Sequence, residues 1–354
     1  MIGKSGFPNK CWTQFGVKNV VKGIPGNPKP GILIPEILAA LRTGPTELSR
    51  VYLQALANGD YQKLRKMPVK NHDITSRPIK QWEFFVDNKG YSIVITASCL
   101  AVNTNEKLPA VIYFHGGGWC IGSRAQVQNA MRLLAEYSGA VVFNVEYRLA
   151  PEYRYPCATD DCWQVVRYIH ANAAELGIDT NKIVVAGDSA GGNIAAACSR
   201  RNRNARTKMI WQQVLIYPVL SQIDPVYEAD YHFSVNDYCI DDSQAQWIIP
   251  CINSVKMSMS GKHLYANNIN EAMSADASPL LDKDYAGLPK TLIICAEYDY
   301  LTQQCKTYAK RLAAANIDVT LLVYSGTNHG FFDYIGNYPQ SADAVLEFAK
   351  AFSV

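Results

Sequence analysis

The chain has no long hydrophobic segment. Its 354 residues contain no uninterrupted apolar run approaching the roughly 18 residues of a membrane-spanning helix. The N-terminal stretch MIGKSGFPNKCWTQFG also lacks the apolar run of a secretory signal peptide. We therefore expect no membrane span and a cytoplasmic location.

Cysteine pairs with metal-binding spacing are absent too. The chain has 10 cysteines, but no two of them form a C-x-x-C motif. Several, such as Cys198 and Cys295, fall in apolar segments typical of a protein core. Reduced thiols with structural roles are the simpler interpretation. We expect neither a metal nor an organic cofactor.

Charge of one sign is not concentrated anywhere except in one short stretch. The formal net charge is +3, and internal repeats and low-complexity tracts are absent. The stretch Ser199–Arg206 is dense in arginine, but no known nucleic-acid-binding motif accompanies it. We interpret it as a solvated helix end and expect no nucleic-acid partner.

Short apolar, β-branched runs alternate with helical patterns from residue 82 onward. Such runs are typical of strands that are buried on both faces, and the alternation indicates a mostly parallel sheet wrapped by helices. The sequence predicts an α/β fold with eight strands, in the runs WEFFVDN, YSIVITASCL, PAVIYF, AVVFNVEY, KIVVAG, QVLIYP, TLIICAE and VTLLVY.

Two segments interrupt this alternation. Residues 1–80 precede the sheet and have helical or irregular patterns, and residues 221–276 separate two strands by more than a crossover needs. Long insertions in a compact domain are usually lids or binding loops. We expect both segments to form a helical cap over a catalytic body made of residues 81–220 and 277–354.

A possible nucleophile lies between a predicted strand and a predicted helix. The segment Gly187-Asp188-Ser189-Ala190-Gly191 fits the pattern G-x-S-x-G, in which a sharp turn projects the serine hydroxyl outward. The helix N-terminus behind the serine favours developing negative charge. Ser189 is therefore the predicted nucleophile.

A serine hydroxyl needs a neighbouring base, and the base needs a carboxylate that fixes its tautomer. Of six histidines, His329 stands in a glycine-flanked loop directly after the last strand-like run. Core, surface or loop roles suffice for the other histidines, which are His72, His115, His170, His232 and His263.

Asp299 follows the preceding strand and is the favoured carboxylate for His329. Glu297 is its nearest competitor, and Asp276 and Asp282 are poorer candidates because they precede that strand. The chain order Ser189, Asp299, His329 is the order found in α/β-hydrolases.

The motif His115-Gly-Gly-Gly118 leaves a predicted strand through three consecutive glycines. Attack on a carbonyl builds negative charge on its oxygen, and backbone N–H groups must point at that oxygen. We predict that Gly116, Gly117 and Ala190 supply these donors as an oxyanion hole.

Together these motifs resemble the hormone-sensitive-lipase-like branch of α/β-hydrolase esterases, which includes plant carboxylesterases and arylacetamide deacetylases. The resemblance covers roughly residues 80–350. It rests on His115-Gly-Gly-Gly118, Tyr147-Arg-Leu-Ala-Pro-Glu152, Gly187-Asp-Ser-Ala-Gly-Gly192, Asp299 with Leu301, and His329-Gly-Phe331.

The resemblance implies a serine carboxylesterase that forms an acyl-enzyme intermediate, with small esters of short- to medium-chain, aryl or acetyl type as substrates. It also implies a cap and a possible homodimer, and loop-supporting roles for Asp188 and Asp161. This chain departs from the family at Tyr300, where relatives often have proline.

Other functions on the same fold remain open. Plant gibberellin receptors resemble this family but lack the triad histidine, whereas His329 is present here. An amidase, deacetylase or peptidase could use the same triad, although no sequence feature signals a peptide-selecting domain. A triglyceride lipase would need an apolar surface segment for lipid docking, and none stands out.

Overall fold

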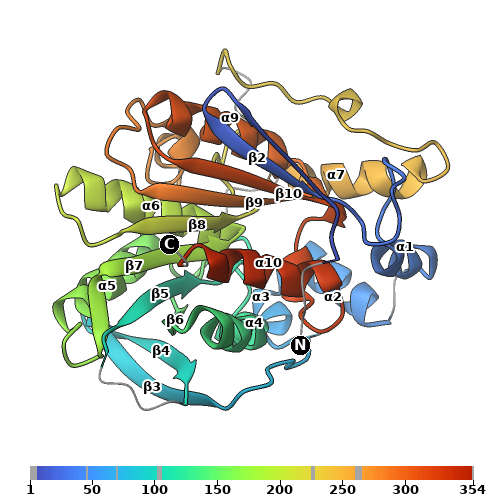
Figure 1. Cartoon of the computed structure of the whole chain (residues 1–354). Coiled ribbons are helices and arrows are strands. Elements are labelled where there is room, and N and C mark those ends of the chain that lie inside the picture. The colour runs from blue at the N-terminus through green and yellow to red at the C-terminus, as the bar shows by residue number, and fades with distance from the viewer. Residues whose placement is uncertain are drawn as a thin grey trace.

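One large twisted sheet organises the molecule (Figure 1). The computed structural model describes residues 6–44, 47–68, 71–101, 106–224, 228–259 and 265–352. In this part of the chain the sheet has 10 strands in the order β1-β2-β10-β9-β8-β7-β5-β6-β4-β3. All neighbours from β2 to β6 in that order run parallel, and antiparallel pairs lie at the two edges of the sheet.

The elements follow one another along the chain with these bounds. The strands are β1 Asn9–Gln14, β2 Val17–Lys22, β3 Ile79–Asn88, β4 Tyr91–Leu100, β5 Leu108–Phe114, β6 Val141–Glu146, β7 Ile178–Asp188, β8 Gln212–Ile216, β9 Lys290–Tyr298 and β10 Val319–Asn328. The α-helices are α1 Pro35–Arg42, α2 Glu47–Ala57, α3 Tyr61–Arg65, α4 Arg124–Ser138, α5 Cys157–Ala171, α6 Ala190–Asn204, α7 Ala245–Met259, α8 Ile269–Ala272, α9 Leu301–Ala314 and α10 Pro339–Lys350. The 3₁₀-helices are η1 Val235–Asp237, η2 Pro279–Leu281 and η3 Phe331–Asp333.

The predicted α/β fold is confirmed, but the predicted strand count is wrong. All eight expected strands form, as β3 to β10, and the hairpin β1–β2 adds two more. Strand β2 pairs in parallel with β10, so that Leu322 lies opposite Val20. The segment 1–80 is therefore not only helical or irregular, because its first part extends the sheet.

A two-residue turn closes this N-terminal hairpin. Phe15 and Gly16 both have positive φ angles, of 51° and 76°, which suits the right-handed twist of the two flanking strands. Every residue of β1 is exposed, so this strand lacks the apolar alternation by which strands are recognised in a sequence. The sequence signal for this hairpin is Gly16, which lies between two short runs that are compatible with β-strands.

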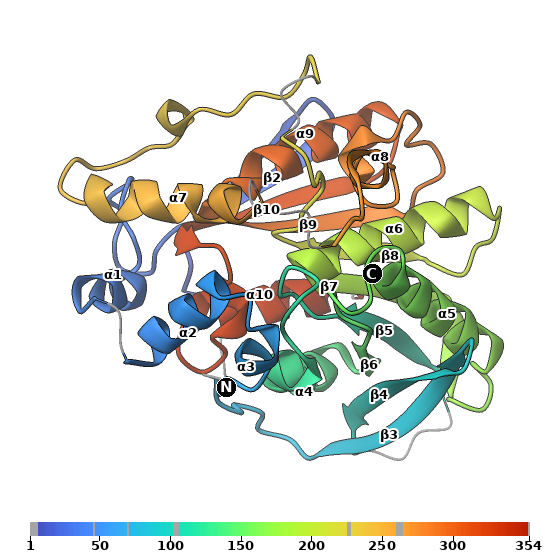
Figure 2. The ribbon, with the colours of Figure 1, turned by 180° about the vertical axis from the view of Figure 1, so that it is seen from behind.

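Helices cover both faces of the sheet, and the side chains of each strand alternate between the two layers. In β5, Ile112 and Phe114 belong to the apolar cluster that includes α5, α6 and α9. Val111 and Tyr113 of the same strand belong to the cluster that includes α4 and α10. Figure 1 shows α4 and α10 in front of the sheet, and Figure 2 shows α5, α6 and α9 on the opposite side.

Parts of the two segments expected to form a cap pack against each other. Ile37 of α1 shares an apolar cluster with Ile248 and Ile252 of α7. The backbone N–H of Leu33 also donates to the side-chain oxygen of Gln244, at 2.9 Å. That the two segments act together as a cap stays a prediction.

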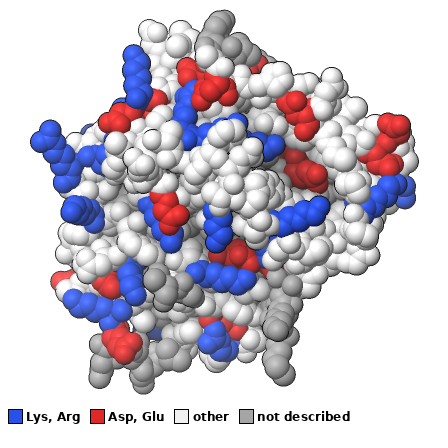
Figure 3. Space-filling model, turned by 45° about the horizontal axis from the view of Figure 1, so that its top comes forward, with Lys and Arg blue, Asp and Glu red and all other residues white. Residues whose placement is uncertain are grey.

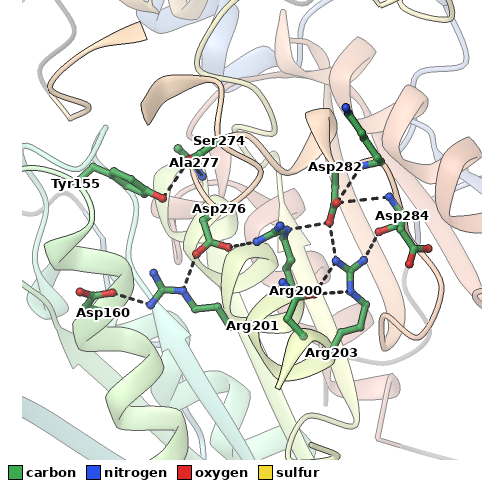
Figure 4. Close-up of polar contacts among 12 residues, drawn as sticks. Tyr155, Asp160, Arg200, Arg201, Arg203, Ser274, Asp276, Ala277, Asp282 and Asp284 are labelled. Atoms are coloured by element: carbon green, nitrogen blue, oxygen red, sulfur yellow. Dashed lines mark hydrogen bonds and ion pairs between the residues drawn. The ribbon is translucent and has the colours of Figure 1, made fainter. Parts of the chain in front are cut away.

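The arginine-rich end of α6 is not solvated as expected but holds the chain that returns from the second segment (Figure 4). Arg200 and Arg201 each bind one oxygen of Asp276, at 2.7 and 2.8 Å. Arg200 and Arg203 both bind Asp282, at 2.9 Å. Side-chain exposure of 13% to 25% confirms that these arginines are largely covered.

Charged side chains of both signs are interspersed on one face of the molecule. On the face seen in Figure 3, basic and acidic groups alternate and do not form a single patch. Among the described residues, no helix is long and apolar enough to cross a membrane.

A buried lysine fastens the N-terminal hairpin to the C-terminal helix. Lys22 of β2 is 1% exposed, and its Nζ lies 2.9 Å from Asp343 Oδ2 and 2.7 Å from Glu347 Oε1 of α10. The hydroxyl of Tyr324 donates to the same oxygen of Asp343, at 2.7 Å. Among the described residues, Lys22 is the cation paired with Asp343, so removing the lysine would leave this buried carboxylate uncompensated there.

The substitution Lys22→Ala is expected to lower the free energy of unfolding by about 3–5 kcal/mol, the usual cost of breaking a buried ion pair from one side. Urea unfolding followed by circular dichroism measures the change. Lys18→Ala, at an exposed position of the same strand, is the matched control. Equal effects of the two substitutions would contradict the assigned role of Lys22.

Candidate active site

The turn between β7 and α6 holds Ser189 in an unusual backbone conformation. Its φ of 53° and ψ of −115° lie outside the regions that most residues adopt. Three backbone hydrogen bonds fix the turn: Ser189 N–H donates to Ile216 O, and Val219 N–H and Asn193 N–H both donate to Ser189 O. Ser189 thus begins helix α6 from a strained turn, as a G-x-S-x-G motif predicts.

Close approach of backbones explains the glycines around this serine. A Cβ on Gly187 would lie 2.4 Å from the carbonyl carbon of Gly191, and a Cβ on Gly191 would lie 1.9 Å from Phe114 O of β5. Any side chain at either position would push α6 away from the sheet. The glycines therefore set the distance between the helix and the strands that flank it.

The structure brings the predicted triad residues together from three strand ends. Ser189 Oγ lies 3.0 Å from His329 Nε2, and His329 Nδ1 lies 2.7 Å from Asp299 Oδ2. Asp299 is fully buried, and its other oxygen accepts the Leu301 N–H at 2.9 Å. With Nδ1–H donating to Asp299, Nε2 is left to accept the serine proton.

The competing carboxylate has a different contact. Glu297 Oε2 accepts the backbone N–H of Gly326 at 2.7 Å, beside the irregularity in the pairing of β9 with β10. Asp276 and Asp282 belong to the arginine network of α6. Of the four acidic candidates, Asp299 is the one that lies against His329.

The remaining histidines lie in other contacts. His115 is buried, and its ring stacks on Tyr147 with 4.4 Å between the ring centroids. His232 has a side chain that is 76% exposed and lies 3.5 Å from Asp237. The backbone N–H of His72 donates to Ile335 O, His170 lies in α5, and His263 is outside the described residues.

Three carboxyl groups act on the protonation of His329. Burial alone lowers the pKa of His329, but the nearby charge and hydrogen bond of Asp299, followed by the charges of Asp188 and Asp333, raise it, and the net shift is upward. Burial, then the charge of Asp188, raises the pKa of Asp333 to about 8. Sequence analysis did not single out Asp333, which follows His329 by only four positions.

The first glycine of the H-G-G-G motif has a contact that its predicted role did not anticipate. The N–H of Gly116 donates to Asp188 Oδ1 at 3.0 Å, and the Tyr113 hydroxyl donates to the same oxygen at 2.8 Å. A Cβ on Gly116 would lie 2.1 Å from the other oxygen of Asp188. The Gly116 N–H is thus already used, which is a physical reason against its role as an oxyanion donor.

The next two glycines have free amides. Within the described part of the chain, no acceptor contacts the N–H groups of Gly117 and Gly118. Gly117 has a φ of 116°, and a Cβ there would lie 2.1 Å from Ile121 O, so glycine is required. Ala190 is the first residue of α6, where backbone N–H groups have no partner within the helix. Gly118, which we did not select from the sequence, therefore joins Gly117 and Ala190 as a candidate donor.

A metal site is not apparent among the described residues. No group of three or more His, Cys, Asp or Glu side chains there is arranged to hold a metal ion. The chemistry of this arrangement is that of a serine activated by a histidine, next to unpaired backbone donors.

Comparisons with known proteins agree with this arrangement. Residues 111–333 match the family model described as the alpha/beta hydrolase fold. Carboxylesterase NlhH from Mycobacterium tuberculosis is 33% identical over 241 residues, which cover 68% of this chain and 71% of the relative. An arylesterase from Saccharolobus solfataricus is 33% identical over 233 residues, covering 64% of this chain and 69% of the relative.

Solved structures extend the similarity to most of the chain. A Pyrobaculum calidifontis esterase superposes with a TM-score of 0.68 at 29% identity and covers 90% of this chain and 98% of its own. The fold, the motifs and these relatives lead to one conclusion: the chain belongs to the α/β-hydrolase family, in its hormone-sensitive-lipase-like branch.

Proposed function

We propose that this protein is a serine carboxylesterase that hydrolyses small carboxylic esters through an acyl-enzyme intermediate. The observation that carries the proposal is the hydrogen-bonded series Ser189–His329–Asp299, with distances of 3.0 and 2.7 Å. The esterase names of the relatives support the same reaction class.

The reaction has two halves. Ser189 Oγ attacks the ester carbonyl carbon while His329 Nε2 takes the hydroxyl proton, and the protonated imidazole then gives that proton to the leaving alcohol. Water attacks the acyl-enzyme with His329 again as the base, which releases the carboxylic acid and restores Ser189. Asp299 stabilises the imidazolium in both halves and stays ionised.

The negative charge on the substrate oxygen is stabilised by backbone amides. We assign this role to Gly117 and Ala190, as the sequence suggests, and to Gly118 in place of Gly116, whose N–H donates to Asp188. These donors are held in position before substrate arrives, so they cost no reorganisation during the reaction.

Esters with short- to medium-chain acyl groups are the proposed substrates. Trp119, directly after the glycines, stacks on Tyr265 with 4.5 Å between the ring centroids and 6° between the planes. Tyr265 comes from the segment 221–276, so the second proposed cap segment lies against residues 116–120, which we call the glycine turn. The stack leaves less room there than small side chains would.

Two alternative functions share this site. An amidase or deacetylase would use the same triad, and no contact among the residues that the structure describes favours it over an esterase. A non-catalytic receptor would not need the His329–Asp299 pair, whose 2.7 Å contact argues for catalysis.

Location and assembly complete the proposal. All 10 cysteines are free thiols, which supports a reduced, cytoplasmic environment. We propose small-molecule esters as the partners, with no nucleic acid. A homodimer stays a prediction that light scattering can test.

Ser189→Ala is expected to lower kcat by about 10⁶-fold, because the nucleophile and its proton transfer are lost together. Hydrolysis of p-nitrophenyl esters from acetate to decanoate measures the loss, and the wild-type optimum gives the preferred acyl length. Wild type should also be labelled at Ser189 by a fluorophosphonate. Near-normal turnover by folded Ser189→Ala would refute the assignment, and wild type that neither turns over nor labels would favour a receptor.

Asp299→Asn is expected to lower kcat by about 10⁴-fold, because the amide favours the wrong tautomer of His329. Glu297→Gln is the matched control, since it alters a carboxylate on the same strand end that contacts Gly326 and not His329. If the control variant showed the larger loss, the two carboxylates would have to exchange roles.

The pH dependence of kcat/KM follows from the pKa shift of His329. The imidazole must be neutral to accept the serine proton, and its pKa is raised above the ordinary 6.5. Activity should therefore fall as the pH drops through a value above 6.5. Profiles from about pH 5 to about 9 test this. An acid limb at or below the ordinary histidine value would be inconsistent with the Asp299 contact.

A further inference from the structure

Arg65, at the end of the short helix α3, contacts both loops that lie beside the glycine turn. Its Nε donates to the backbone oxygen of Cys120 at 2.8 Å, and one terminal nitrogen donates to Ala150 O at 2.7 Å. The terminal nitrogens also bind both oxygens of Glu152, at 2.9 and 2.8 Å. The guanidinium therefore spans two backbone carbonyls and one carboxylate, a set that a lysine could not satisfy.

The Cys120 carbonyl leads directly to the glycine amides. The peptide that carries Cys120 O also carries the N–H of Ile121, which donates to Gly117 O at 3.0 Å. The Gly117 carbonyl in turn shares its peptide plane with the Gly118 N–H. A continuous series of hydrogen bonds thus runs from Arg65 to the Gly117–Gly118 peptide, and each bond in such a series strengthens the next.

The second carbonyl secures the same turn from its other side. Ala150 accepts from Arg65 through its oxygen, and its N–H donates to Trp119 O at 2.8 Å. Trp119 itself has a φ of 60°, a conformation that its large side chain disfavours. Contacts to Cys120 and Ala150 therefore hold a turn that would not keep this shape by local preference alone.

The positive charge of Arg65 is balanced by the carboxylate of Glu152. Its hydrogen bond to Glu152, outweighing the effect of burial, lowers the pKa of that carboxyl to about 2, and Gln62 donates to the same group at 2.9 Å. Burial raises the pKa of the Cys120 thiol to about 11, so the thiol stays protonated and only the carbonyl of Cys120 takes part.

We propose that Arg65 is a positioning residue that sets the oxyanion hole, so that catalysis depends on the docking of helix α3 onto the glycine turn. The inference rests on the proposed esterase function. It gives the N-terminal segment, in which sequence motifs are absent, a role in the chemical step as well as in covering the site.

The test compares Arg65→Ala with wild type on p-nitrophenyl acetate. A displaced donor peptide should lower kcat by up to about 10²-fold and leave KM nearly unchanged, because the lost interaction acts in the transition state. Binding of a trifluoromethyl ketone, which forms a tetrahedral oxyanion on the serine, should weaken in parallel with kcat/KM. Millimolar guanidinium ion should restore part of the activity of Arg65→Ala, whereas a merely structural role would not respond to it.

Two further variants separate the possible outcomes. Arg132→Ala is the matched control, since Arg132 also joins the N-terminal segment to the body, through Asp73 at 2.9 Å, but does not contact the glycine turn. Its kcat should equal that of wild type. Arg65→Lys should stay impaired, and it replaces Arg65→Ala if that variant does not fold.

Unchanged kcat and inhibitor affinity in folded Arg65 variants would overturn the inference, as would an equal loss in Arg132→Ala. The proposed function would be intact in that case, because wild type would still hydrolyse the ester. Wild type that is inactive and unlabelled by a fluorophosphonate would instead defeat the proposed function itself.

Discussion

The close packing of helix α6 against β5 and β7 is the constraint on which the site depends. Gly191 approaches Phe114 O so closely that no side chain fits, and the Ser189 backbone absorbs the resulting sharp turn. This turn aims the serine hydroxyl at His329 and places Ala190 N–H at the start of the helix. The strain stored there is compensated by buried strands on both sides.

A second constraint is electrostatic. Asp188, Asp299 and Asp333 all act on His329, yet each has a different use. Asp299 contacts the imidazole, Asp188 accepts from Tyr113 and Gly116, and Asp333 accepts from Gln126 at 2.6 Å. Burial raises the pKa of both Asp188 and Asp333 above the usual value of an aspartate.

The parts of the chain outside the regular α/β alternation are fastened by charged groups. Lys22 ties the N-terminal hairpin to α10, Arg65 ties α3 to the glycine turn, and the arginines of α6 hold the segment that returns from α7. Each of these groups is largely buried and satisfied by two or more acceptors. Such contacts specify position more than they add stability, because desolvation offsets much of the attraction.

The sequence by itself determined eight of the strands, β3 to β10, and the helices between them, and it singled out Ser189 and His329. These follow from patterns within short windows: alternating or continuous apolar runs, and glycines around one serine.

Tertiary structure decided the features that depend on contacts between residues far apart in the sequence. It placed the hairpin β1–β2 on β10, selected Asp299 over Glu297 as the partner of His329, and used the Gly116 amide on Asp188. It also brought Arg65 to Cys120, 55 positions away. No local pattern encodes such pairings, because a hydrogen bond between distant residues depends on the position of every element that separates them.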